Sequence, residues 1–124
     1  MKKRILVVEN DKDIRDILSI ILIDEGYQVR VYGTEEHIFD HIRDFKPHVI
    51  LLDIIRPTVE GTELCRSIKA AETTKHIPVI VLSTHLKIES VKEVCADEVV
   101  PKPFDVPQLL KAIEGELMEG EIEN

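Results

Sequence analysis

The sequence predicts a doubly wound α/β domain, in which five parallel strands alternate with helices that cover both faces of the sheet. Two observations lead to this fold class. Short apolar runs of strand length recur along the chain, and each is followed by a stretch whose apolar residues repeat at helical spacing. Four of the runs lead into polar residues, as strands do when their carboxyl ends line a binding edge. The expected strand order is 2-1-3-4-5, which makes the first and third strands neighbours.

The first part of the chain predicts two strands with one helix between them. Residues 5–8 form an apolar run, and residues 11–25 follow it with an apolar stripe at helical spacing. Gly26 predicts the end of this helix, because glycine readily adopts the backbone conformation that terminates helices. Val29 and Val31 alternate with polar residues and indicate a short edge strand. The helical stripe consists of Ile14, Ile17, Leu18, Ile21 and Leu22.

The middle of the chain predicts a second helix, a buried strand and a third helix. Thr34 is a candidate cap for the second helix, which would end at Pro47. Residues 48–52 are almost wholly apolar, as expected for a strand buried on both faces. Pro57 and Gly61 are expected to break the chain before the third helix. The second helix would bury Ile38, Ile42 and Phe45, and the third Leu64, Cys65 and Ile68.

The last part of the chain predicts two strands and two helices. Pro78 opens the fourth strand, residues 79–82, and residues 99–100 belong to the fifth. Asp105 is a candidate cap for the final helix. A short fourth helix would carry Ile88, Val91, Val94 and Cys95, and the final helix Leu109, Leu110, Ile113 and Leu117.

Length and composition predict one soluble globular domain. The chain is 44% hydrophobic and 32% charged, and its net charge of -8 argues against nucleic acid or anionic membrane as a partner. No apolar stretch approaches the length of a membrane span. Cys65 and Cys95 form no CxxC motif, which favours reduced thiols and a cytoplasmic location. The domain should cover residues 1–118, followed by an acidic, frayed tail of residues 119–124.

Polar residues at four strand ends predict one binding cleft. They are Glu9 and Asn10 after the first strand, Asp53 at the third, Ser83 at the fourth and Lys102 after the fifth. Carboxylate and amide oxygens of Glu9, Asn10 and Asp53 suit Mg²⁺. Lys102 and Ser83 offer a charge and a hydroxyl to phosphoryl oxygens. A carboxylate in such a cleft can attack phosphorus to form an acyl phosphate.

With this set of residues at its strand ends, the sequence resembles the receiver domains of two-component response regulators. The resemblance extends from Lys3 to about Leu117. It rests on residues 5–11, on Leu52-Asp53-Ile54 with Pro57 and Gly61 downstream, on Ser83, and on Lys102-Pro103-Phe104.

The resemblance implies a role for each residue of the cleft. Asp53 would be the phosphoacceptor, and Asn10, Asp53 and the main-chain carbonyl of Ile55 would line the Mg²⁺ site. Glu9 would act on the metal directly or through water. Ser83 would be the switch hydroxyl, and Lys102 would pair with the phosphate.

Three departures from the family pattern affect these expectations. The first strand is usually followed by two acids, but here by Glu9 and Asn10, so Mg²⁺ binding should be weaker. The residue after the switch hydroxyl is usually small, whereas Thr84 would crowd access to Asp53. The fifth strand usually carries a mobile aromatic, and Val99 takes its place.

The resemblance implies a signalling module and not an enzyme acting on a separate substrate. A histidine kinase or phosphotransfer protein would donate the phosphoryl group. The fourth helix, fifth strand and final helix would then change their affinity for a downstream protein, for an effector domain missing from this sequence, or for a second copy of the chain.

Other functions remain open from the residues. The departures at Asn10, Thr84 and Val99 also fit an interaction module that no longer depends on phosphorylation. A phosphatase is disfavoured because Ile55 stands where a second acid would serve as general acid. An FMN electron carrier is disfavoured by the aromatic content of 4%. His37 and His41 have helical spacing for a shared metal, but further ligands are lacking in the sequence around them.

Overall fold

The computed structural model describes residues 2–53, 59–83 and 95–122. In chain order the elements are β1 (Arg4–Val8), α1 (Lys12–Asp24), β2 (Gln28–Tyr32), α2 (Ile38–Phe45), β3 (Val49–Asp53), α3 (Val59–Ala70), β4 (Val79–Ser83), β5 (Glu98–Pro101) and α5 (Val106–Ile122). The helix predicted around residues 88–94 and the break predicted at Pro57 lie outside the described residues. None of the described helices has the length and apolar composition of a membrane span.

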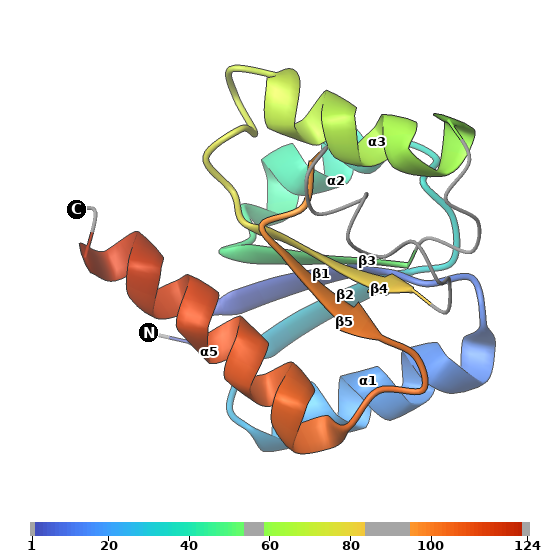
Figure 1. The fold of residues 1–124 in the computed structure, drawn as a ribbon, viewed down its shortest axis with the longest axis vertical. Helices are drawn as coiled ribbons and strands as arrows, with labels where there is room; N and C mark the ends of the chain where they lie inside the picture. The colour runs from blue at the N-terminus through green and yellow to red at the C-terminus, as the bar shows by residue number, and fades with distance from the viewer. Residues whose placement is uncertain (1, 54–58, 84–94, 123–124) are drawn as a thin grey trace.

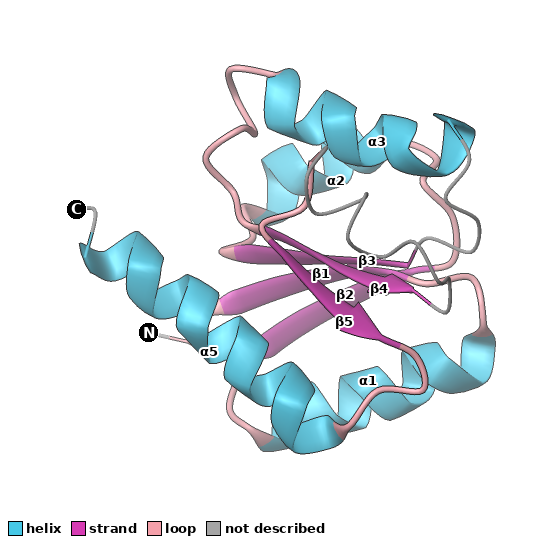
Figure 2. Ribbon diagram, viewed as in Figure 1, coloured by secondary structure: helices cyan, strands magenta, loops and turns pink. Residues whose placement is uncertain are grey.

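The five strands form one parallel sheet in the order β2-β1-β3-β4-β5, which confirms the predicted topology (Figure 2). Ile5 of β1 pairs with Val49 of β3, and Asp53 at the end of β3 pairs with Leu82 of β4. Because every strand runs the same way, the residues that follow the strands meet at one carboxyl edge.

Helices cover both faces of the sheet, as predicted. α1 and α5 lie on one face, and α2 and α3 lie on the other (Figure 1). Residues 49–52 of β3 are almost completely buried, which confirms the strand expected to be covered on both faces. The α1/α5 layer is built on Leu18, Leu22, Leu109 and Ile113, and the α2/α3 layer on Ile38, Ile42, Phe45, Cys65 and Ile68.

The ends of α1 follow from local chemistry. Asp11 caps the helix, since its carboxylate accepts hydrogen bonds from the backbone of Asp13 and Ile14 at 2.9 and 3.2 Å. Gly26 follows the helix with φ of 95°, which confirms the predicted stop. The predicted inner stripe was partly wrong, because the side chain of Ile17 is 49% exposed.

The predicted start of the second helix was wrong. Thr34 does not cap α2, which begins at Ile38 after a left-handed His37 with φ of 59°. The Thr34 hydroxyl instead accepts a hydrogen bond from the backbone N–H of Glu36 at 3.3 Å. This local turn uses the capping hydroxyl before the helix begins.

Two other helix boundaries differ from the sequence analysis. Gly61 was expected to break the chain, but it lies inside α3. α5 continues to Ile122, into the stretch 119–124 that was expected to be a frayed tail.

The two cysteines also differ from expectation. Reduced thiols were expected, but the structure pairs Cys65 of α3 with Cys95, which precedes β5, in a disulfide with a Cα–Cα distance of 5.8 Å. The residues are 30 positions apart in sequence. Helical spacing indicates which face a cysteine occupies, but not which distant residue meets it there.

Candidate functional site

Three charged side chains meet at the carboxyl edge of the sheet. Nζ of Lys102 lies 2.8 Å from Oδ1 of Asp53 and 3.1 Å from both Oε atoms of Glu9. The exposed fractions of the side chains are 0% for Glu9, 4% for Asp53 and 11% for Lys102. The cluster is therefore a nearly solvent-free ion triad, assembled from residues up to 93 positions apart in the chain.

The strand register brings the triad together. Val8 of β1 pairs with Leu52 of β3. The next residues, Glu9 and Asp53, therefore lie at neighbouring ends of these two adjacent strands. Lys102 follows β5, which is separated from β3 by β4, and its long side chain spans this distance. The peptide bond between Lys102 and Pro103 is cis.

The buried charges shift one another's proton affinities. Burial raises the pKa of Glu9 to about 7, with further contributions from the hydrogen bond and the negative charge of Asp53, while Lys102 opposes this rise. Burial would lower the pKa of Lys102, but its hydrogen bonds with Asp53 and Glu9 together raise it above its ordinary value. Near neutral pH Glu9 therefore holds a proton part of the time, while the lysine stays charged.

A fourth residue, which the sequence analysis missed, supports the triad from behind. Nη1 of Arg15 donates a hydrogen bond to the backbone carbonyl of Glu9 at 2.7 Å. Gly33 makes room for it, because a Cβ at this position would lie 2.8 Å from the same nitrogen. Arginine near the amino end of a helix is disfavoured by the helix dipole. A basic residue at this position in α1 was therefore the sequence signal that Arg15 has a tertiary partner.

Of the remaining predicted site residues, the structure describes Asn10, the backbone of Ser83, and Val99. Asn10 follows Glu9 and is exposed. Ser83 is the last residue of β4, and its backbone pairs with Pro101, but its side chain lies outside the described set. Ile55 and Thr84 also lie outside the described residues. Val99 is partly buried against the α2/α3 layer.

The histidine pair set aside as a metal site is explained by other contacts. His41 stacks on Tyr32 with ring centroids 4.0 Å apart, and His37 lies near the carboxylates of Glu36 and Asp40. Within the described part of the chain, no group of three or more His, Cys, Asp or Glu residues is placed to hold a metal.

Known proteins with the same features identify the family. The family model for the response regulator receiver domain matches residues 5–114. The chain is also similar to the solved response regulator receiver domain protein (CheY-like) from Methanospirillum hungatei, with 30% identity, a TM-score of 0.86 and full coverage of both chains. This chain belongs to the response regulator receiver domain family.

Two curated relatives are longer than this chain. The DNA-binding response regulator MtrA of Mycolicibacterium smegmatis is 30% identical over 99% of this chain and 54% of its own length. The response regulator MprA of Mycolicibacterium vanbaalenii is 33% identical over 89% of this chain and 48% of its own length. The chain thus spans about half the length of the curated relatives it matches.

Proposed function

We propose that this receiver domain accepts a phosphoryl group on Asp53 from a histidine kinase or phosphotransfer protein. The observation that carries the proposal is the 2.8 Å contact between Asp53 and Lys102 at the buried end of β3. Lys102 contacts one oxygen of Asp53 but both oxygens of Glu9. Since Glu9 is also partly protonated near neutral pH, Asp53 is the better nucleophile of the two.

The proposed chemistry transfers the group between two side chains. An oxygen of the Asp53 carboxylate attacks phosphorus of a phosphohistidine, the P–N bond breaks, and its electron pair returns to the imidazole of the donor. The product is an acyl phosphate on Asp53. Lys102 would turn from the carboxylates to a phosphoryl oxygen, and its raised pKa keeps it charged for this role. The hydroxyl of Ser83 is proposed to donate to a second oxygen.

The donor set fits Mg²⁺. Glu9 and Asp53 place two carboxyls together, and burial, followed by the hydrogen bond with Asp53, raises the pKa of Glu9. A cation bound there would favour the charged form of Glu9. Glu9, Asp53, the exposed amide of Asn10 and the main-chain carbonyl of Ile55 would hold the ion. When bound, Mg²⁺ would neutralise charge on the phosphoryl oxygens. An amide at position 10 makes the site less charged, so we propose that the ion binds weakly.

The exposed apolar face of α1 is a suitable place for the donor to dock. Ile17, Ile20 and Ile23 repeat every three positions, and Ile20 is 69% exposed. α1 begins at Lys12, immediately after the residues that follow β1. An apolar helix of the donor protein on this face would bring its histidine close to Asp53. Replacing Ile20 with Glu should slow transfer from the donor protein but leave labelling by a small phosphodonor unchanged.

A second function is favoured by the closed ion triad. Lys102 pairs with both carboxylates at almost no exposure, so the unphosphorylated domain leaves neither buried carboxylate without a cationic partner. In this alternative the domain binds partners without phosphorylation. The two functions differ in whether a phosphoryl group changes partner affinity.

Intact-mass analysis after incubation with acetyl phosphate and magnesium tests the proposal. One addition of about 80 Da is expected in the wild type, as for a single acyl phosphate. Asp53→Asn should abolish it, whereas Asp44→Asn, which changes an exposed aspartate of α2, should label normally. Full labelling of Asp53→Asn would overturn the assignment. Absence of labelling in every protein would favour the phosphorylation-independent module.

A further inference from the structure

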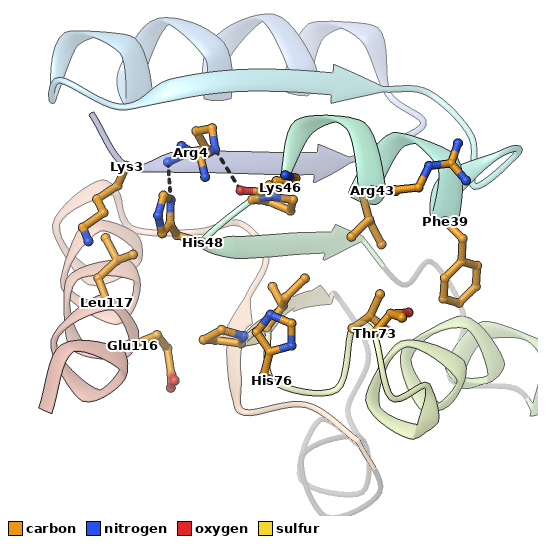
Figure 3. A pocket seen from close by; sticks show the side chains of 15 residues that line it. Lys3, Arg4, Phe39, Arg43, Lys46, His48, Thr73, His76, Glu116 and Leu117 are labelled. Carbon is orange, nitrogen blue, oxygen red and sulfur yellow. Dashed lines mark hydrogen bonds between the residues drawn. The ribbon is translucent and has the colours of Figure 1, made fainter. Parts of the chain in front are cut away.

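A cavity of about 820 Å³ opens at the amino edge of the sheet, opposite the ion triad. It lies between α2, the residues that lead into β1, β3 and β4, and the end of α5 (Figure 3). A five-residue strand at about 3.3 Å per residue separates the two edges by about 17 Å. A ligand in this cavity would therefore not contact Asp53.

The lining is cationic in a protein that is strongly acidic overall. Lys3, Arg4, Arg43 and Lys46 line the cavity, and Glu116 is the one acidic residue among the described residues that line it. The whole chain carries a net charge of -8. Clustering of like charges around a concavity focuses a positive potential there and attracts anions.

Helix electrostatics account for part of this clustering. Basic residues are stabilised near the carboxyl end of a helix, and α2 ends beside Lys46. Arg43 also pairs with Asp40 at 3.2 Å and Asp44 at 3.5 Å. Nε of Arg4 donates to the backbone carbonyl of Lys46 at 2.8 Å. These contacts position the cations, but the α2 terminus does not account for Lys3, which comes from the chain before β1.

The cavity also contains a directed N–H donor. Nδ1 of His48 accepts a hydrogen bond from the backbone N–H of Arg4 at 3.0 Å (Figure 3). Burial, then the charges of Arg4 and Lys3, lower the pKa of His48, so the ring is neutral at neutral pH. A neutral ring that accepts at Nδ1 carries its proton on Nε2. The ring therefore offers a donor and no positive charge of its own.

The rest of the lining is apolar. Phe39 is 41% exposed although it is a large aromatic side chain, and Figure 3 shows its ring at one side of the cavity, far from Leu117. Ile42, Ile77 and Leu117 also line the space. Cationic and apolar walls in one cavity suit a ligand that has both an anionic group and an apolar body.

We propose that this cavity binds an amphiphilic anion, a small molecule with one carboxylate or phosphate head group and an apolar body. The head group would lie among Arg4, Lys46 and the Nε2–H of His48. The apolar body would extend from this head group toward Phe39. The site is separate from the proposed phosphoacceptor function, and ligand binding does not require Asp53.

A set of matched probes tests the two halves of the ligand separately. Amide chemical shifts are followed during titration with octanoate, with 1-octanol, which lacks the charge, and with acetate, which lacks the chain. Octanoate should bind about tenfold or more tightly than either partial probe, because two favourable contributions combine. Its shifts should centre on Phe39, His48 and Thr73. Octyl phosphate provides the comparison between the two head groups, and preferential binding of either anion over octanol supports the site.

Variants test the cationic wall. The double variant Arg43→Gln/Lys46→Gln should weaken octanoate about tenfold, since each partly exposed charge contributes modestly. Lys12→Gln/Lys111→Gln removes the same charge from α1 and α5 outside the cavity and should change affinity less than about twofold. Asp53→Asn should bind octanoate as the wild type does, whether or not it can be phosphorylated. Equal binding of octanol and octanoate, equal effects of both double variants, or shifts centred on the carboxyl edge would overturn the proposal.

Discussion

At the carboxyl edge of the sheet, Glu9, Asp53 and Lys102 are almost fully buried and pair with one another, whereas at the amino edge cationic side chains surround an open cavity. The two edges differ in how far water reaches their charged side chains. The stability of a buried charge cluster depends on every one of its members, because a buried charge without a partner destabilises the folded state. Charges at an open cavity are hydrated and screened, so no single one is essential. The first arrangement gives a defined chemical site, and the second gives an adaptable binding surface.

Removing one cation from each edge should give the largest contrast. Lys102→Met leaves two buried carboxyls without their cation and should lower the free energy of unfolding by about 3 kcal/mol. Lys46→Gln at the cavity should lower it by about 0.5 kcal/mol or less. Urea unfolding at pH 7.5 without divalent ions measures both. Equal losses would show that burial does not make the charges at the carboxyl edge more important for stability than those at the amino edge. Added magnesium should restore part of the stability of Lys102→Met, since the ion can replace the missing charge.

Adding a charge at each edge should give the next largest effect. Asn10→Asp supplies a second acid after β1 and should tighten Mg²⁺ binding by about tenfold. Gln28→Glu makes a similar change at the opposite end of the sheet, on β2, and should leave Mg²⁺ affinity unchanged. Chemical-shift titration with magnesium chloride measures both affinities. Weaker binding to Asn10→Asp would mean that position 10 is not a ligand position.

A methyl group at Gly33 tests the support behind the triad. Gly33→Ala places a Cβ 2.8 Å from Nη1 of Arg15, so the end of this side chain must shift, which weakens its hydrogen bond to the Glu9 carbonyl. We expect a loss of about 1 kcal/mol in stability, the typical value of one hydrogen bond, and slower labelling of Asp53. Gly115→Ala in α5 meets nothing within 4 Å and should be neutral or stabilising. If both variants behave alike, the hydrogen bond does not support the site.

The smallest effect concerns pH at the amino edge. The pKa of His48 is lowered from 6.5 in the folded state, so the folded protein binds its proton less readily than the unfolded chain. The contribution of His48 to stability is therefore complete above pH 6.5 and is lost as the pH falls toward the lowered pKa. Protonation also removes the acceptor for the Arg4 N–H.

His48→Asn isolates this contribution, because the amide oxygen can accept the Arg4 hydrogen bond but does not titrate. The difference in unfolding free energy between wild type and variant, measured by urea unfolding, should shrink or reverse between pH 7.5 and pH 5. A difference independent of pH would show that the ring is not held neutral.

Sequence patterns predicted the strands better than the helix boundaries. The buried strand at residues 49–52 and the order of all five strands were predicted from apolar runs and from the rules for parallel sheets. The helix boundaries were predicted wrongly where a residue type that often marks a helix end can also serve in other local structures. The hydroxyl of Thr34 bonds within a turn and not at the helix, and Gly61 is accommodated inside α3. Glycine gives the backbone more freedom and threonine offers a capping hydroxyl, but neither residue alone decides where a helix starts.

The sequence by itself determined that Glu9, Asp53 and Lys102 lie at the carboxyl ends of parallel strands, since the alternation of strands and helices follows from local apolar patterning and the strand order from the rules for parallel sheets. Only the tertiary structure decided that Lys102 contacts both carboxyls, that Arg15 reaches the Glu9 carbonyl, and that Cys65 meets Cys95. It alone also revealed the cavity at the amino edge. Patterns of burial are encoded over a few residues, whereas these contacts join residues from separate elements and depend on how the layers pack around the sheet.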